Sequence, residues 1–184
     1  MRITGGISKG LQLNVPKKYH IRPTTDRIRE AIFSMLASMT CEWSRCLDLY
    51  AGSGALGIEA LSRDAQWIDF VDQEPRCCAI IKQNLEKSGL VHKAHVYCCS
   101  VVKALTFLEG KYDIIFIDPP YSDSKLENLI LQVDNQALLQ KGSLVVIPHS
   151  SRTTLSEEYG RLRLVKRKQH GDTCISIYFR EVDN

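Results

Sequence analysis

The order of hydrophobic and polar positions changes character along the chain. Residues 1–15 place three glycines between short apolar stretches, a pattern typical of a small hairpin. Residues 24–39 carry apolar side chains at helical spacing, after threonines suited to capping a helix. From Cys46 onward, short apolar runs alternate with helical patterns, and two further strand-like runs end the chain.

These patterns predict five strands joined by crossover helices, which requires a parallel, doubly wound α/β sheet. The strands are expected at residues 46–50, 67–72, 94–99, 112–118 and 142–148. The helices are expected at residues 55–63, 75–89, 101–110 and near 125–138. Residues 161–168 and 173–180 flank a Gln-His-Gly-Asp turn and predict an antiparallel hairpin that ends the sheet. The prediction is one domain, with residues 1–23 as an N-terminal hairpin extension and residues 24–184 as a Rossmann-like core.

Composition narrows the class of protein only slightly. Apolar residues make up 44% and charged residues 24%, which is ordinary for a globular protein. No apolar run reaches the roughly 18–20 residues of a membrane span, and the N-terminus lacks a secretory pattern, so a cytoplasmic protein is expected. The seven cysteines are odd in number and include two adjacent pairs, which favours reduced, buried thiols and no metal site.

Charge is distributed unevenly. Residues 1–30 carry a net charge of +5, residues 31–149 of −4, and residues 150–184 of +2. Basic ends around an acidic middle suggest that the ends contact a polyanion, although a solvated basic face explains the pattern equally well. The C-terminal hairpin concentrates five cations: Arg161, Arg163, Lys166, Arg167 and Lys168.

A glycine-rich loop lies between the first strand and its helix. Gly52, Gly54 and Gly57 match G-x-G-x-x-G, and Asp72 ends the next strand. This context indicates an adenosine-containing cofactor, with the acid placed for a ribose diol. NAD is one candidate, but Asp48 in the first strand would repel an anion and attract a cation. S-adenosylmethionine carries an ammonium and a sulfonium, so methyl transfer is favoured over hydride transfer.

The fourth strand ends in Asp118-Pro119-Pro120-Tyr121. In an open α/β sheet, ligands bind beyond the carboxyl ends of the strands, and the first and fourth strands are neighbours in the usual order. Asp118 and the Pro119 carbonyl could then accept hydrogen bonds from an exocyclic base amine, with Tyr121 as a stacking face. The alternative is an ordinary Asp-Pro turn.

The segments RITGGISKG, RPTTDRIREAIFSML, LDLYAGSGALGIEALSR, FIDPPY and a late YG together resemble the RsmD family of 16S ribosomal RNA guanine-N2 methyltransferases. The resemblance covers essentially the whole chain. It implies a class I methyltransferase fold with a seven-stranded sheet. It also implies S-adenosylmethionine as cofactor and the small ribosomal subunit, or an assembly intermediate, as partner of a monomeric enzyme without membrane contact.

The resemblance also implies site residues. Cofactor contacts are expected from the glycine loop and the next two strand ends: Asp48, Tyr50, Ala51, Gly52, Ser53, Gly54, Gly57, Asp72, Gln73, Ser100 and Val101. The target amine is expected at Asp118, Pro119, Pro120 and Tyr121, and RNA contacts at Lys9, Arg22, Thr24 and Arg27.

Several positions depart from the family pattern. Leu11 replaces an expected Arg, Asp72 a usual Glu, and Pro148 an expected Glu, while Ser100 stands where an Asp or Asn commonly meets the adenine amine. None of these changes removes a catalytic group. Four alternatives remain open: an amino-methyltransferase for another RNA, one for DNA adenine, an NAD-type oxidoreductase, and a non-catalytic assembly factor that retains a cofactor pocket.

Overall fold

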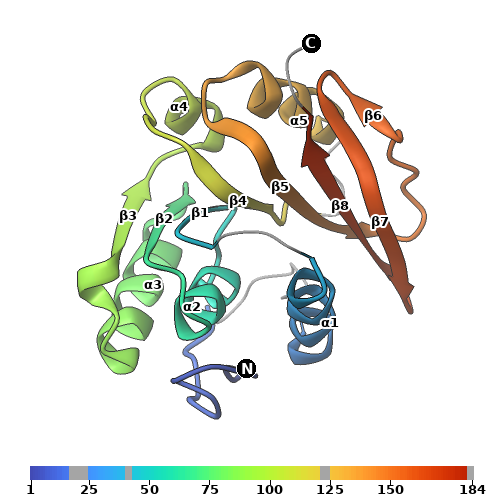
Figure 1. The fold of residues 1–184 in the computed structure, drawn as a ribbon. Coiled ribbons are helices and arrows are strands. Elements are labelled where there is room, and N and C mark those ends of the chain that lie inside the picture. Colours follow the sequence, from blue (N-terminus) through green and yellow to red (C-terminus); the bar gives the residue numbers. More distant parts are fainter. Residues whose placement is uncertain (17–24, 40–42, 121–124, 182–184) are drawn as a thin grey trace.

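The computed structural model describes residues 1–16, 25–39, 43–120 and 125–181 (Figure 1). The helices are α1 Asp26–Ala37, α2 Ala55–Ser62, α3 Pro75–Ser88, the 3-10 turn Val91–Lys93, α4 Val101–Leu105 and α5 Leu126–Asn135. The strands are β1 Arg45–Leu49, β2 Trp67–Asp72, β3 Ala94–Cys98, β4 Tyr112–Ile117, β5 Leu139–Ser150, β6 Glu158–Tyr159, β7 Leu162–His170 and β8 Thr173–Arg180.

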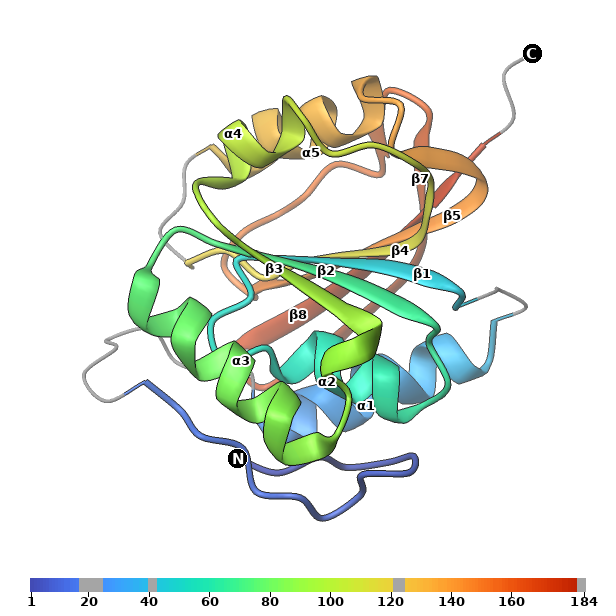
Figure 2. The same ribbon diagram turned by 90° about the vertical axis from the view of Figure 1, so that its left-hand side faces the viewer.

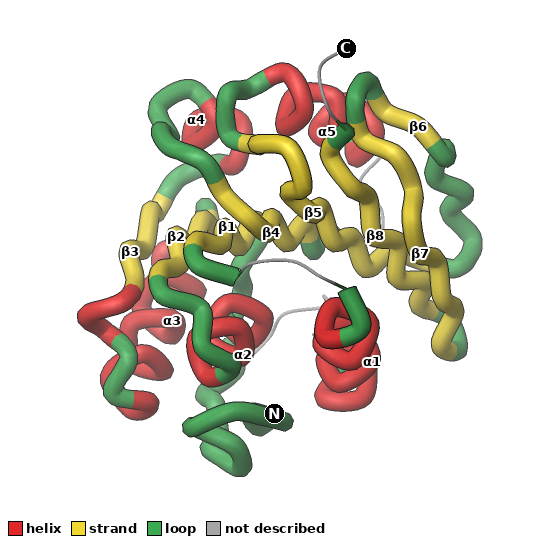
Figure 3. Tube along the Cα trace, viewed as in Figure 1, coloured by secondary structure: helices red, strands yellow, loops and turns green. Residues whose placement is uncertain are grey.

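The strands form one mixed sheet in the order β3-β2-β1-β4-β5-β8-β7-β6 (Figure 3). The first five are parallel, and β8 runs antiparallel between β5 and β7. The predicted class and terminal hairpin are therefore confirmed. Among the residues that the structure describes, the sheet has eight strands rather than seven, because a turn at Gly160 (φ +59°) folds Glu158 and Tyr159 back onto the start of β7.

Helices cover both faces of the sheet (Figure 2). One apolar core lies between the sheet and α1, α2 and α3, and includes Phe33 and Phe116. A second core lies on the side of α4 and α5, and includes Tyr112 and Tyr178. Alternation along each strand sends successive side chains into opposite cores, as burial on both faces of a parallel sheet requires.

Local signals explain where the helices begin and end. The Thr25 hydroxyl accepts a hydrogen bond from the Ile28 N–H and caps α1. Pro75 occupies the first turn of α3, and Gly89 ends that helix with a φ of +70°. The short α4 begins at Ser100, whose hydroxyl accepts from the Lys103 N–H (3.3 Å), and it stops at Leu105 instead of continuing to residue 110 as predicted.

The N-terminal extension, residues 1–16, packs on α2 and α3 rather than on the sheet (Figure 2). Its first part is a hairpin with an antiparallel bridge between Arg2 and Gln12. Gly6 (φ +75°) approaches α2 so closely that a Cβ there would lie 1.7 Å from the Ser62 carbonyl oxygen. None of the helices in the part of the chain that the structure describes is long and apolar enough to cross a membrane.

A buried ionic network joins this extension to α1 and α2. Glu59 accepts hydrogen bonds from the Thr4 N–H (2.8 Å) and the Thr4 hydroxyl (2.7 Å), and from Arg63 Nε (2.9 Å). The fully buried Arg29 bonds Asp26 Oδ1 through Nη2 (2.8 Å) and lies 3.8 Å from Glu59 through Nε. The position of α1 against α2 therefore depends on charged groups as well as on apolar packing.

Candidate active site

The glycine loop, residues 50–54, leaves β1 and enters α2 through a run of left-handed backbone. Tyr50 (φ 60°), Gly52 (φ 56°) and Gly54 (φ 77°) all have positive φ. Only the two glycines adopt this conformation without strain, so a tyrosine there marks a loop whose shape is imposed by its surroundings. The loop is held to β2 by the Ala51 N–H, which donates to the Val71 carbonyl (3.1 Å).

Gly57 brings α2 against the sheet. A Cβ at this position would lie 2.2 Å from Phe70 Cε1 and 3.1 Å from Asp48 Oδ2. The missing side chain lets the Gly57 N–H donate to Asp48 Oδ2 (2.9 Å). The third glycine of the motif thus serves close helix–strand packing and leaves the Asp48 carboxylate beneath the loop.

Asp72 closes the loop from the end of β2. Its Oδ2 accepts from the Gly52 N–H (2.8 Å) and its Oδ1 from the Glu74 N–H (2.9 Å). The Cys77 thiol is a third donor to this carboxylate, which has about four acceptor sites, so a ribose hydroxyl can still bind it in this orientation.

The remaining predicted cofactor residues line the neighbouring strand ends. Gln73 follows Asp72 and is exposed. Ser100 is exposed beyond β3, with its hydroxyl engaged as the α4 cap, and Val101 is buried in the second core.

Asp118 lies at the adjacent strand end, as the predicted strand order requires. Strands β1 and β4 are paired, and the Asp118 N–H donates to the Leu49 carbonyl (3.3 Å), one residue before the glycine loop. Pro119 is buried and Pro120 is partly buried. The structure therefore brings Asp48, Asp72 and Asp118 together at one edge of the sheet.

Electrostatics at this edge favour a cation. Burial raises the pKa of Asp48 well above its usual value. The Gly57 N–H opposes this rise, and the charges of Asp118 and Asp72 add to it. Burial likewise raises the pKa of Asp72, while hydrogen bonds from the Glu74 and Gly52 N–H groups oppose the rise. A ligand carrying positive charge and a ribose would relieve the repulsion and use the free acceptors, so the residues present fit S-adenosylmethionine.

The predicted RNA contacts are more scattered. Arg27 is exposed in the first turn of α1. Lys9 is exposed in the hairpin turn, where neighbouring Ile7 and Ser8 hydrogen-bond Ser62 at the far end of α2 from the glycine loop. Because α2 rises about 1.5 Å per residue, Lys9 lies roughly a helix length from the acidic edge. Arg22, Thr24 and Tyr121 lie outside the described residues.

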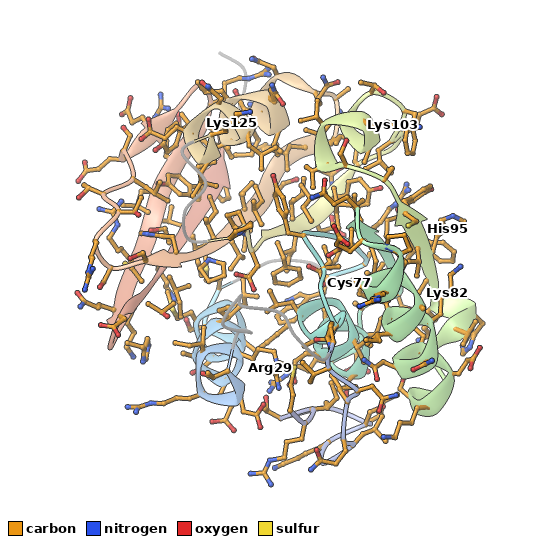
Figure 4. All side chains as sticks on the ribbon, turned by 180° about the vertical axis from the view of Figure 1, so that it is seen from behind. Arg29, Cys77, Lys82, His95, Lys103 and Lys125 are labelled. Atoms are coloured by element: carbon orange, nitrogen blue, oxygen red, sulfur yellow. The ribbon has the colours of Figure 1, made fainter. Side chains whose placement is uncertain are left out.

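Most cations of the C-terminal hairpin have internal partners. Arg161 pairs with Asp134, and Arg163 with Glu158 and Glu181. Lys166 donates to the Met35 carbonyl at the end of α1, and Arg167 donates to the Leu155 carbonyl (2.7 Å). Lys168 is exposed. These partners favour a structural use of the basic residues over phosphate contact. Other lysines, including Lys103 and Lys125, lie toward the α4–α5 side of the sheet (Figure 4).

Sequence reasoning missed the polar side chains behind the loop. Asn84 of α3 is fully buried and hydrogen-bonds both Asn14 and the Ser53 carbonyl. Polar Asn84 within an otherwise regular apolar pattern was the available signal. Among the cysteines that the structure describes, Cys77 and Cys78 are buried as predicted, whereas Cys98 is exposed. Within the described ranges, no cluster of three or more His, Cys, Asp or Glu residues is arranged to hold a metal ion.

The parallel sheet, the glycine loop and the acidic strand ends define a class I methyltransferase. Solved structures support this class. The methyltransferase candidate yhhF of Escherichia coli superimposes with a TM-score of 0.86 at 31% identity over 98% of both chains. An RNA methyltransferase candidate of Pyrococcus horikoshii shares the fold at a TM-score of 0.71 and 17% identity, over 93% of this chain and 95% of that one.

The family model described as "Conserved hypothetical protein 95" matches residues 1–179. This chain belongs to that family, the RsmD family. It is 33% identical to the ribosomal RNA small subunit methyltransferase D of Escherichia coli K12, over 98% of this chain and 90% of that protein. It is 36% identical to the rRNA methyltransferase candidate YlbH of Bacillus subtilis, over 97% of this chain and 98% of that protein.

Proposed function

We propose that this protein transfers a methyl group from S-adenosylmethionine to the exocyclic N2 amine of a guanine in 16S ribosomal RNA. The observation that carries the proposal is the position of Asp118-Pro119-Pro120. This segment follows β4 and lies directly beside the glycine loop, because the Asp118 N–H donates to the Leu49 carbonyl at the end of the paired strand β1. The names of the curated relatives support ribosomal RNA of the small subunit as substrate.

The chain's own groups would act mainly by binding and orientation. Asp48 lies where it would attract the positively charged end of the cofactor, and Asp72 where it would accept from the ribose hydroxyls. Asp118 and the Pro119 carbonyl would accept the two N–H protons of the target amine, which counteracts delocalisation of the nitrogen lone pair into the ring. The cofactor supplies a methyl group already activated on a sulfonium. Alignment of nitrogen, methyl carbon and sulfur would then supply much of the rate enhancement.

The amine loses one proton as the new N–C bond forms and the S–C bond breaks. Asp118, as the acceptor proposed for this amine, would receive the proton directly or through water. We infer that the substrate is presented by the small subunit or an assembly intermediate, since a chain of this size offers limited surface for reading RNA sequence. We infer a monomeric enzyme without membrane contact, and the cytoplasm is the compartment implied by a ribosomal substrate.

The test is methyl transfer from labelled S-adenosylmethionine to unmodified small subunits, naked 16S RNA and duplex DNA in parallel. Label recovered as N2-methylguanosine supports the proposal. Label on adenine or in DNA keeps the amine-binding role of Asp118 but replaces the substrate, and no transfer with intact cofactor binding favours the assembly-factor alternative.

Asp118→Ala provides the matching loss of function. Removing an acceptor at the reacting amine should reduce turnover at saturating cofactor by about 100-fold or more, whereas loss of a like charge beside Asp48 should not lower the melting temperature. Glu109→Gln is the control, because Glu109 is an exposed acid that precedes β4 at the opposite edge of the sheet. Full activity in Asp118→Ala would remove Asp118 from the mechanism.

A further inference from the structure

The N-terminal extension reaches the cofactor loop as well as the far end of α2. Its hairpin turn contacts Ser62, whereas Met1 lies at the start of α2. There the Ser53 hydroxyl donates to Met1 Sδ (3.5 Å). The Asn14 backbone lies against α3, one side chain away from the same loop.

That side chain is Asn84. Its Oδ1 accepts from the Asn14 N–H (2.8 Å), and its Nδ2 donates to the Asn14 carbonyl (3.0 Å) and to the Ser53 carbonyl (2.9 Å). A carboxamide has two N–H donors, so both are used, one on each segment. Asn84 thus bridges the backbone of the extension and the backbone of the glycine loop with no solvent between them.

The bond to Ser53 bears on the shape of the loop. Ser53 lies between Gly52 and Gly54, two residues with positive φ that rotate at little cost. The Ser53 carbonyl belongs to the peptide unit that enters α2, and Ser53 is itself buried. Without Asn84 this carbonyl loses its side-chain partner, and the peptide unit gains freedom to turn away from the arrangement that faces the cofactor.

We propose that Asn84 is a positioning residue that couples the N-terminal extension to the cofactor loop. The extension belongs to the strongly basic first 30 residues, which suits contact with RNA. RNA bound at the extension and cofactor bound at the loop then favour the same arrangement of Asn14, Asn84 and Ser53. Coupling of this kind is reciprocal: RNA tightens cofactor binding by the same factor by which cofactor tightens RNA binding. The inference rests on the proposed function for the identity of both ligands.

The test measures S-adenosylhomocysteine affinity with and without saturating unmodified small ribosomal subunits. The wild-type protein should bind S-adenosylhomocysteine about fivefold or more tightly when RNA is present, which is the lower end of typical coupling between two binding sites. Asn84→Ala and the isosteric Asn84→Asp should reduce this ratio to about one. In turnover assays they should raise KM for both substrates more than they lower kcat, because a purely structural defect reduces the active fraction and leaves KM unchanged.

Gln83→Ala is the matched control. Gln83 is the preceding residue of α3 and also bonds Asn14, but only through the Asn14 side chain (3.3 Å) and without reaching Ser53. This variant should keep the wild-type ratio and both KM values. Asn84 variants that fold and retain the wild-type ratio would overturn the proposal.

Hydrogen exchange in the wild-type protein gives an answer even if the Asn84 variants do not fold. Added S-adenosylhomocysteine should slow exchange of the Asn14 amide, whose hydrogen is donated to Asn84 rather than to the ligand. Unchanged Asn14 exchange at saturating ligand overturns the coupling. Slowed exchange in a protein that methylates no RNA supports the coupling and refutes the proposed function, so the two failures are distinguishable.

Discussion

Asp48→Asn should make the protein more stable while weakening its cofactor site. Asp48 is buried beneath the glycine loop, and its one hydrogen-bond partner among the described residues is the Gly57 N–H at 2.9 Å. Asp118 and Asp72 add like charge around it. An asparagine of the same shape keeps an oxygen for the Gly57 N–H and removes the charge. Asp48 is therefore retained at a cost in stability.

The size of the gain follows from two opposing terms. A buried, uncompensated carboxylate carries an effective desolvation penalty of several kcal/mol, part of which protonation already avoids. The neutral acceptor weakens the Gly57 hydrogen bond by about 1 kcal/mol. A net gain of about 1–2 kcal/mol in the free energy of unfolding corresponds to a rise of about 2–8 °C in Tm for a chain of this length.

The gain also has a defined pH dependence. The folded pKa of Asp48 is raised above the unfolded value of 3.8, so the folded wild type binds more protons than the unfolded chain as pH rises from that value. Wild-type stability therefore falls as pH increases through the interval up to the folded pKa. Asparagine lacks this titration. The advantage of Asp48→Asn should be smallest near pH 4 and should grow toward neutral pH.

Asp69→Asn is the matched control. Asp69 is equally buried, but it pairs with Arg45 (3.1 Å) and accepts from the Tyr112 hydroxyl (2.6 Å) and Trp67 Nε1 (3.0 Å). The same substitution should lower stability there by about 1.5–3 kcal/mol, since charged hydrogen bonds are lost without relief of repulsion.

Thermal unfolding of wild type, Asp48→Asn and Asp69→Asn across pH 4–8 measures the expected gain in stability of the first variant and the expected loss in the second. Calorimetry measures S-adenosylmethionine binding. Binding to Asp48→Asn should weaken by about tenfold or more, equivalent to about 1.4 kcal/mol. An Asp48→Asn variant that melts below wild type at neutral pH, or binds the cofactor as tightly, would refute this account of the acidic edge.

Three further outcomes are expected. Gly57→Ala should lose about 1–3 kcal/mol of stability despite the helical preference of alanine, because its Cβ would meet Phe70 at 2.2 Å; a rise in Tm would contradict this packing. Iodoacetamide should alkylate Cys98 before the buried Cys46, Cys77, Cys78 and Cys174, as read by peptide mass spectrometry; equal labelling would contradict the described exposure. Lys166→Ala should lower the free energy of unfolding by about 0.3–1 kcal/mol, and with it Tm, because the contacts at the end of α1 are lost, and it should leave the salt dependence of RNA binding unchanged; a slope of log affinity against log salt that falls by about one would indicate phosphate contact.

The elements that the sequence predicted well are those with strong local patterns. Strand β2 was predicted at its observed bounds, and α3 between a proline and a glycine, because both carry periodic apolar residues between clear breakers. The proximity of Asp118 to the glycine loop was also predictable, since strand order in a doubly wound sheet follows from connectivity. Strand β6 was not predicted, because a strand of two residues is too short to show an alternating pattern and depends on the turn at Gly160.

Long-range polar contacts had no comparable signal. Glu59 lies 55 residues from Thr4, and Asn84 lies 70 residues from Asn14, so neither pair shares a local pattern. The resemblance grouped Lys9 with the RNA contacts. The position of Lys9 at the far end of α2 follows from the close approach of Gly6 to Ser62, which no local pattern in the sequence indicates. Burial of a polar side chain is decided by which partners the fold brings to it, and sequence reveals only that the residue is polar.

The acidic edge shows how the fold brings together residues that lie far apart in the sequence. Asp48, Asp72 and Asp118 come from three adjacent parallel strands, whose carboxyl ends must meet at one edge of the sheet. Together they add to the effect of burial, because the charges of Asp118 and Asp72 raise the pKa of Asp48 further, and a cation bound among them would relieve this repulsion. The repulsion that destabilises the protein would become attraction for a positively charged cofactor, so the stability gained by Asp48→Asn and the affinity lost by it would have the same electrostatic origin.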